Sequence, residues 1–203
     1  MFNFFDGNDM PQQDRKIFYH GTKTEILGGY LRPNKAFNSV QDKICSGAFA
    51  TTDLNHAKFF AINSCLSGNG HTQQDGKKVF LERLSSNIKT RFFVYSLYEM
   101  MDNPFIHDSG TEYYALKPVK IASFQTFNIA EEIKNLGYEV YVLNEPLKSI
   151  SNMSVGNNFD VRAEMADAIE KKLYHRVDVD AVIKQQQSQS LVYRIFRNVF
   201  QRD

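Results

Sequence analysis

Cysteine and tryptophan are scarce in this sequence, and long hydrophobic runs are missing. The chain of 203 residues has two cysteines and no tryptophan. Cys45 and Cys65 stand in no CxxC or other ligand-like spacing, which argues against a disulfide framework and a zinc site. No run approaches the roughly 18 apolar residues that a spanning helix needs, and the first residues lack the features of a secretory signal. We expect no metal, no transmembrane segment, and a protein that is cytoplasmic or is delivered into a target cell independently of a signal peptide.

Excess charge of either sign is also missing. The 24 Lys and Arg residues nearly balance the 23 Asp and Glu residues, for a formal net charge of +1. Duplex-binding proteins usually concentrate basic charge, so we expect no nucleic-acid partner. A hydrophobic content of 42% is ordinary for a globular protein. The length allows one well-buried core with a small appendage.

Short runs rich in aromatic and β-branched residues alternate with turn residues along most of the chain. They predict strands at 16–20, 47–51, 78–84, 91–98, 111–116, 119–127 and 138–143. Helical spacing runs from Leu54 to a break at Ser67, and recurs at 130–136, 159–175 and 179–201. Many short strands followed by a helical tail favour an α+β fold.

Composition divides the chain into four parts. We predict a flexible leader at 1–15, a core domain at 16–147, a linker rich in Ser, Asn and Gly at 148–158, and a helical C-terminal appendage at 159–203. Within the core, 34–46, 67–76 and 99–110 are predicted loops. The appendage ends in an apolar stripe with arginines on the opposite side, and we expect the stripe to pack on the core. Contact with a partner or a membrane surface is the alternative. The stripe comprises Leu191, Ile195, Phe196 and Val199.

The segment 18–22 combines two aromatics, an imidazole, a glycine and a hydroxyl at the end of the first predicted strand. Glycine weakens a strand interior and usually marks a close approach to the backbone. We therefore interpret His20, Gly21 and Thr22 as the start of a binding site.

Three segments together resemble a known superfamily. FYHGTK at 18–23, with GGYL at 28–31, resembles the YHGTK and GDxL opening of the rifampin ADP-ribosyltransferases. Phe49-Ala50-Thr51, with an alanine and a phenylalanine downstream, resembles the YxT strand and AxW helix of the same family. TEYY at 111–114 resembles the strand that supplies the catalytic glutamate in poly(ADP-ribose) polymerases and diphtheria-type toxins. The three match the H-Y-E pattern of the ADP-ribosyltransferase superfamily over residues 16 to about 145.

The resemblance implies a fold and an activity. It implies two small, mostly antiparallel sheets around an NAD cleft, and a mono-ADP-ribosyltransferase, which is a glycosyltransferase that uses NAD as its substrate. The nicotinamide glycosidic bond would be cleaved and ADP-ribose transferred to an acceptor, which we expect to be a protein, as for a bacterial effector or toxin.

The resemblance also implies a role for each residue. His20 would bond the adenosine ribose, and the Gly21 backbone would hold the nicotinamide carboxamide. Phe49 would stack on the nicotinamide, with Phe59 or Phe60 as the opposite wall, while Thr22 and Thr51 complete the same cofactor-binding segments. Glu112 would bond the nicotinamide ribose, and its charge would stabilise the cation formed as nicotinamide leaves.

Two departures from the pattern bear on this hypothesis. Phenylalanine stands at position 49, where the superfamily usually has tyrosine, so stacking is kept but a hydroxyl is lost. Gly110 stands two residues before Glu112, where arginine-modifying toxins carry Glu or Gln, which makes arginine a less favoured acceptor. The rifampin enzymes place an acid in the preceding loop, so Asp102 is the alternative catalytic residue.

Other interpretations remain open. His20 can be a strand-end histidine, the phenylalanines can belong to the core, and Glu112 can be a solvated edge residue. As a whole, the protein can be a rifampin-type enzyme that modifies a small molecule, an RNA 2′-phosphotransferase, or an NAD-binding or interaction module without catalysis.

Overall fold

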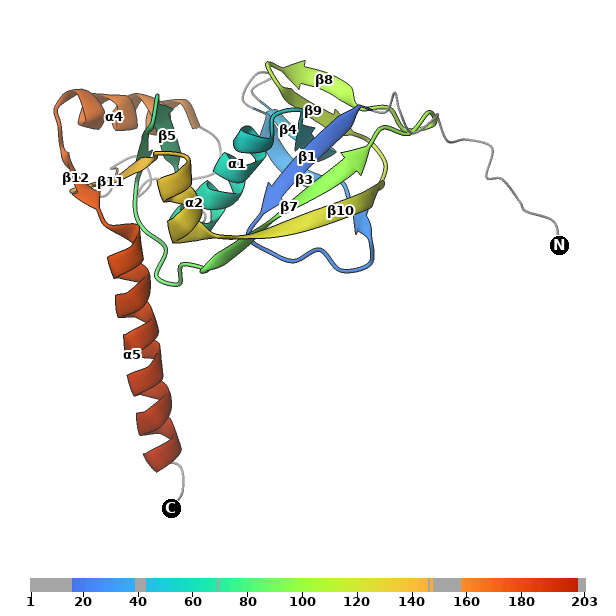
Figure 1. The fold of residues 1–203 in the computed structure, drawn as a ribbon. Coiled ribbons are helices and arrows are strands. Elements are labelled where there is room, and N and C mark those ends of the chain that lie inside the picture. Colours follow the sequence, from blue (N-terminus) through green and yellow to red (C-terminus); the bar gives the residue numbers. More distant parts are fainter. Residues whose placement is uncertain (1–15, 39–42, 69, 146, 148–157, 201–203) are drawn as a thin grey trace. The chain divides into compact units, whose positions relative to one another are not determined.

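The chain forms an α+β fold with two mostly antiparallel sheets (Figure 1). The computed structural model describes residues 16–38, 43–68, 70–145, 147 and 158–200. They fall into two compact units. Unit 1 takes in the described residues up to Ala61 together with Phe92–Phe127, and unit 2 takes in Ile62–Arg91 together with the described residues from Asn128 onward.

Unit 1 is built on the larger sheet, whose strands follow the order β2-β10-β7-β1-β4-β9-β8, with β3 paired to β4. Strand β1 is paired with β7 along its whole length, from Ile17 opposite Tyr98 to Thr22 opposite Phe93. The strands are β1 (Ile17–Thr22), β2 (Tyr30–Leu31), β3 (Asn34–Asn38), β4 (Lys43–Thr51), β7 (Arg91–Tyr98), β8 (Ile106–Ser109), β9 (Glu112–Ala115) and β10 (Val119–Asn128).

One face of this sheet buries an aromatic and aliphatic cluster. Phe18 stacks on Phe105 with ring centroids 4.1 Å apart and meets Tyr113 edge-on at 5.1 Å. Tyr95 is 1% exposed, and its hydroxyl accepts a hydrogen bond from Ile26 N at 2.7 Å. The cluster is completed by small and branched side chains from five strands, which are Leu31, Ala48, Ala50, Leu97, Ala115 and Val119. This packing holds β1 between β7 and β4.

Helix α1 (Leu54–Ser67) starts in unit 1, directly after β4. Asp53 caps it, because its Oδ1 accepts from Asn55 N at 2.8 Å and from His56 N at 3.3 Å. The helix lies so close to β1 that a Cβ at Gly21 would stand 1.8 Å from the Ala57 carbonyl oxygen and 3.2 Å from the Ala61 Cβ. Only glycine fits here.

Unit 2 is built on a four-stranded sheet of order β12-β11-β6-β5, in which β11 and β6 are parallel. Its strands are β5 (Thr72–Asp75), β6 (Lys78–Leu81), β11 (Glu139–Leu143) and β12 (Tyr174–Val177). Its helices are α2 (Ile129–Asn135), α4 (Asn158–Glu170) and α5 (Val179–Phe200), in addition to the end of α1. Phe80, Leu143, Leu147, Val161 and Met165 form a buried cluster between sheet and α4.

The predicted α+β class and most predicted elements are confirmed. Strand 91–98 has the predicted bounds, α1 starts at Leu54, and Gly137, with a φ of 68°, follows the cap of α2. Five of the described strands were not predicted: β2 lies in no predicted element, β3, β5 and β8 lie in predicted loops, and β12 starts at the end of a predicted helix. The appendage also differs, because β12 pairs with β11 and so joins the C-terminal helices to the sheet of unit 2. The predicted leader and nearly all of the linker lie outside the described residues.

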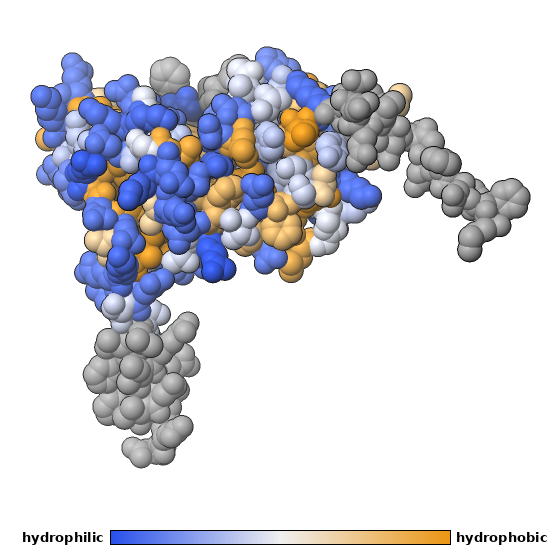
Figure 2. All heavy atoms as spheres, in the orientation of Figure 1, coloured by the Kyte–Doolittle hydropathy of each residue, from blue (hydrophilic) through white to orange (hydrophobic). Residues whose placement is uncertain are grey.

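Polar residues cover most of the face drawn in Figure 2, with hydrophobic atoms visible between them. One exposed hydrophobic side chain is Phe124 on β10, at 52%. Among the residues that the structure describes, no helix combines the length and the apolar character needed to cross a bilayer. The side chains of the C-terminal apolar stripe lie outside the described set.

Substituting Gly21 tests the contact between β1 and α1. We expect Gly21→Ala to lower the free energy of unfolding by about 3 kcal/mol or more, since the new methyl group would meet helix backbone that cannot move alone. Urea unfolding measures this value. Gly29→Ala is the control, because the φ of Gly29 is 73° and its Cβ position is open, so only the cost of a left-handed residue applies, about 1–2 kcal/mol. A Gly21→Ala protein as stable as the wild type would contradict the packing.

Candidate functional site

The three predicted site segments occupy three neighbouring strands of unit 1. His20 lies on β1, Phe49 on β4 and Glu112 on β9, and these strands follow one another in the sheet (Figure 1). In register, Tyr19 lies opposite Thr51, and Thr51 lies opposite Glu112. The segments are separated by 29 and 63 positions in the sequence, and the fold brings them together.

His20 is fixed by a hydrogen bond across the gap between β1 and β4. Its Nδ1 lies 2.8 Å from the Phe49 carbonyl oxygen. A carbonyl only accepts, so Nδ1 carries the proton and the neutral ring keeps a lone pair on Nε2. Burial lowers the pKa of His20 below its ordinary value of 6.5, and the bond to Phe49 offsets only part of this effect. His20 is therefore held as a neutral ring with one acceptor nitrogen.

The side chains divide between the two faces of the sheet. Strand alternation and the register place Gly21, Phe49, Thr51 and Glu112 on the face that α1 covers at Gly21. The side chain of His20 points to the opposite face, where Phe18 also lies. In the described strands, the ladder between β1 and β4 is a single position, Tyr19 opposite Thr51. His20 and Glu112 therefore lie on neighbouring parts of the same sheet but on opposite faces.

Aromatic rings line the α1 side of the site. Phe49 is half-buried, with its ring centroid 6.0 Å from that of Tyr114 on the neighbouring strand. Phe59 is buried, whereas Phe60 is 43% exposed. Phe60 stacks on His56, one helical turn earlier, at 4.6 Å and an interplanar angle of 23°. Of the two candidates for the opposite wall, Phe60 is the one that a ligand can reach.

His56 is the site residue that sequence analysis missed. Its Nε2 lies 3.8 Å from the Glu112 carboxylate, and its Nδ1 is hydrogen-bonded to the Thr111 hydroxyl at 2.9 Å. The Thr51 hydroxyl donates to that of Thr111 at 3.0 Å. One signal in the sequence could have found it: the predicted helix starts at Leu54, which places residue 56 on its first turn, directly after a site strand.

Two other predicted residues lie at the margins of the site. The Thr22 hydroxyl accepts from Thr24 N at 3.2 Å and so shapes the turn after β1. Asp102 is exposed, and its carbonyl oxygen accepts from Lys117 Nζ at 3.2 Å. Lys117 follows the far end of β9, so Asp102 lies at the end of that strand away from Glu112. The structure does not bring the two acids together.

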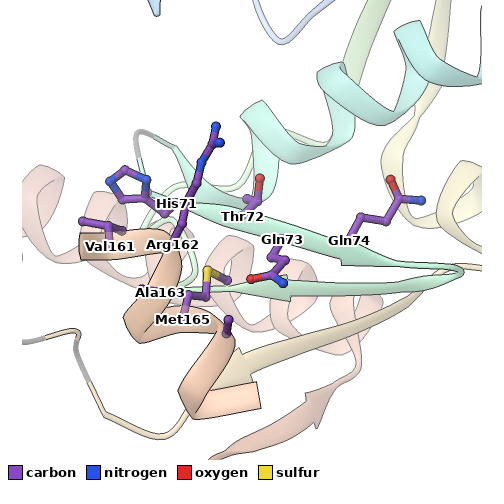
Figure 3. Close-up of a pocket in the computed structure, with 10 residues that line it drawn as sticks. His71, Thr72, Gln73, Gln74, Val161, Arg162, Ala163 and Met165 are labelled. Carbon is purple, nitrogen blue, oxygen red and sulfur yellow. The ribbon is translucent and has the colours of Figure 1, made fainter. Parts of the chain in front are cut away.

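Unit 2 has a pocket of its own, with a volume of about 780 Å³ (Figure 3). It lies along β5, and its wall includes Arg162 from α4. Near it, Asn63 Oδ1 is buried without a hydrogen-bond partner among the described residues, while Asn63 Nδ2 donates to Thr72 at 3.3 Å. The lining includes His71, Thr72, Gln73, Gln74, Val161 and Met165. None of the predicted site residues belongs to this pocket.

No family model, curated protein or solved structure matches this chain. The resemblance to the ADP-ribosyltransferases therefore remains a prediction from the sequence. Within the described ranges, no three His, Cys, Asp or Glu side chains come together as a metal-binding group.

The lowered pKa of His20 predicts how stability depends on pH. Below 6.5 the unfolded chain binds a proton at His20 that the folded chain resists, so the free energy of unfolding falls as the pH falls from 6.5 toward the lower folded pKa. His20→Gln removes this contribution. Urea unfolding of wild type and His20→Gln, above and below pH 6.5, gives the difference between their free energies of unfolding. The change of this difference with pH is the contribution of His20.

His107→Gln serves as the matched control, because His107 is exposed. If the free energies of unfolding of wild type and His20→Gln differ by the same amount at every pH, the burial of a neutral His20 is contradicted. So would an NMR titration that places the His20 pKa above 6.5.

Proposed function

We propose that unit 1 binds NAD and transfers its ADP-ribose group, as a mono-ADP-ribosyltransferase. The observation that carries the proposal is the order of β1, β4 and β9, which supply His20, Phe49 and Glu112 from adjacent strands of one sheet. Before the fold is known, residues so far apart in sequence have no reason to meet. Their convergence is what a shared dinucleotide site requires.

His20 suits the ribose of the adenosine half. Its Nε2 lone pair accepts from a ribose hydroxyl, while Nδ1 is occupied by Phe49 O. The lowered pKa supports this role, because a protonated ring cannot accept. The aromatic rings of Phe49 and Phe60 suit the nicotinamide, a flat cation that stacks on aromatic faces.

Glu112 suits the reacting centre. When the bond between the ribose C1′ and nicotinamide breaks, its electron pair leaves with the nicotinamide nitrogen, and positive charge develops on the ribose. The Glu112 carboxylate, on the face that also carries Phe49, stabilises that charge. The acceptor then adds its electron pair to C1′ and gives up its proton. The balanced outcome is one ADP-ribosylated acceptor, one neutral nicotinamide and one proton.

Gly21 and the pairing of β1 with β4 fit the same arrangement. Its missing side chain lets α1 approach β1, which places Phe60 and His56 beside the sheet. In the described strands, the ladder between β1 and β4 ends at Tyr19. The proposal requires an extended dinucleotide at this end of the ladder, where it would reach His20 on one face and Glu112 on the other. We propose a protein side chain as the acceptor.

Removing the charge of Glu112 tests the proposed chemistry. Glu112→Gln keeps the shape of the side chain, so we expect NAD affinity to change little and kcat for nicotinamide release to fall by about 100- to 1000-fold. Nicotinamide release from NAD, measured by chromatography with and without cell lysate, gives the rate. Calorimetry gives the affinity.

Glu170→Gln, an exposed site on α4 in unit 2, is the matched control and should keep wild-type turnover. Full turnover by Glu112→Gln would refute the role of Glu112, and loss of turnover in Asp102→Asn instead would transfer it to the alternative acid. A wild type that binds NAD without releasing nicotinamide would indicate a binding module, and one that does not bind NAD would remove the proposal.

A further inference from the structure

A chain of hydrogen bonds ends beside Glu112. It starts at the backbone of Asp53, whose N–H donates to the Thr51 hydroxyl at 3.1 Å. The Thr51 hydroxyl lies 3.0 Å from that of Thr111, and the Thr111 hydroxyl lies 2.9 Å from His56 Nδ1. The other nitrogen of His56, Nε2, faces Glu112 Oε1 at 3.8 Å. The chain thus links the start of α1, the end of β4 and the start of β9.

The groups at the two ends of this chain determine which group donates in each hydrogen bond. Thr51 is 2% exposed, so its hydroxyl proton needs an acceptor, and the Thr111 oxygen is the one in reach. Thr111 therefore donates its own proton to His56 Nδ1. At the other end, an ionised carboxylate can only accept. The neutral His56 ring accordingly carries its proton on Nε2, directed toward Glu112.

The ring of His56 is also held by stacking. It lies against Phe60 at 4.6 Å, so rotation would give up both this contact and the bond to Thr111. The 3.8 Å separation from Glu112 exceeds a hydrogen bond. Such contacts are often long without ligand and tighten in the complex. Side chains of His56 and Glu112 are 31% and 38% exposed, so both are accessible to a ligand.

We propose that His56 is a positioning residue that orients the Glu112 carboxylate, through the chain from Asp53, Thr51 and Thr111. This proposal rests on the proposed function of Glu112 in NAD cleavage. Because the neutral ring is fixed as a donor at Nε2, it does not act as a base on the acceptor. Any proton released by the acceptor goes to Glu112 or to water.

The state of the ring can be measured without any enzyme assay. In protein labelled with ¹⁵N-histidine, at a pH where histidine is neutral, we expect the His56 signal to show the Nε2–H form. The signal is assigned by its loss in His56→Phe. Thr111→Val removes the donor to Nδ1 and should shift the ring toward a mixture with the Nδ1–H form, whereas Thr111→Ser should not. An Nδ1–H ring in the wild type would overturn the chain, as would a Thr111→Val protein with an unchanged ring.

Turnover distinguishes positioning from simple packing. His56→Phe keeps an aromatic ring beside Phe60 but has no nitrogen, and we expect kcat to fall by about 10- to 100-fold with little change in KM, as for the loss of an orienting partner. His56→Gln retains an N–H donor near the Nε2 position and should recover most of the lost rate.

Each outcome decides the proposal. Wild-type kcat in His56→Phe overturns the positioning role, and failure of His56→Gln to recover the rate reduces His56 to a packing residue. A wild type without NAD turnover defeats the proposed function and with it the role in cleavage. The NMR measurement still establishes or refutes the hydrogen-bond chain in that case, so the two failures can be told apart.

Discussion

The contact between Gly21 and the backbone of Ala57 is the constraint on which the candidate site depends. A side chain at position 21 would separate β1 from α1, since its first carbon would stand 1.8 Å from a helix carbonyl. With glycine there, the first turns of α1 lie close to the sheet. His56 and Phe60 come from these turns, where their rings stack on each other and His56 faces Glu112.

The second requirement is the order of strands. With β4 between β1 and β9, the backbone oxygen of Phe49 holds His20 on one side, and Thr51 lies opposite Glu112 on the other. In the described strands, β1 and β4 are in register at Tyr19 and Thr51, and His20 and Glu112 lie on opposite faces of the sheet. The low pKa of His20 follows from the same packing, because the half-buried ring is partly desolvated while it bridges the two strands.

The sequence predicted an element correctly where the local residue pattern matches the place of that element in the fold. Strand 91–98 is an apolar and aromatic run in the middle of the sheet, and helical spacing begins at Leu54, directly after the Asp53 cap, so this strand and the start of α1 were predicted correctly. Strand β5 has the sequence Thr-Gln-Gln-Asp and lies at a sheet edge, where a strand needs no apolar pattern. Helix α4 ends at Glu170 because Lys172 takes a φ of 56°, which turns the chain into β12; no residue type there signals this. His56 was missed because its partners lie 55 and 56 positions away in sequence.

The most direct test of the account is a crystal structure of the full chain with a non-hydrolysable NAD analogue. The account predicts that the nicotinamide lies between Phe49 and Phe60, that a hydroxyl of its ribose bonds Glu112, and that the adenosine ribose reaches His20 Nε2. An analogue bound elsewhere, such as in the pocket along β5 of unit 2, would contradict it.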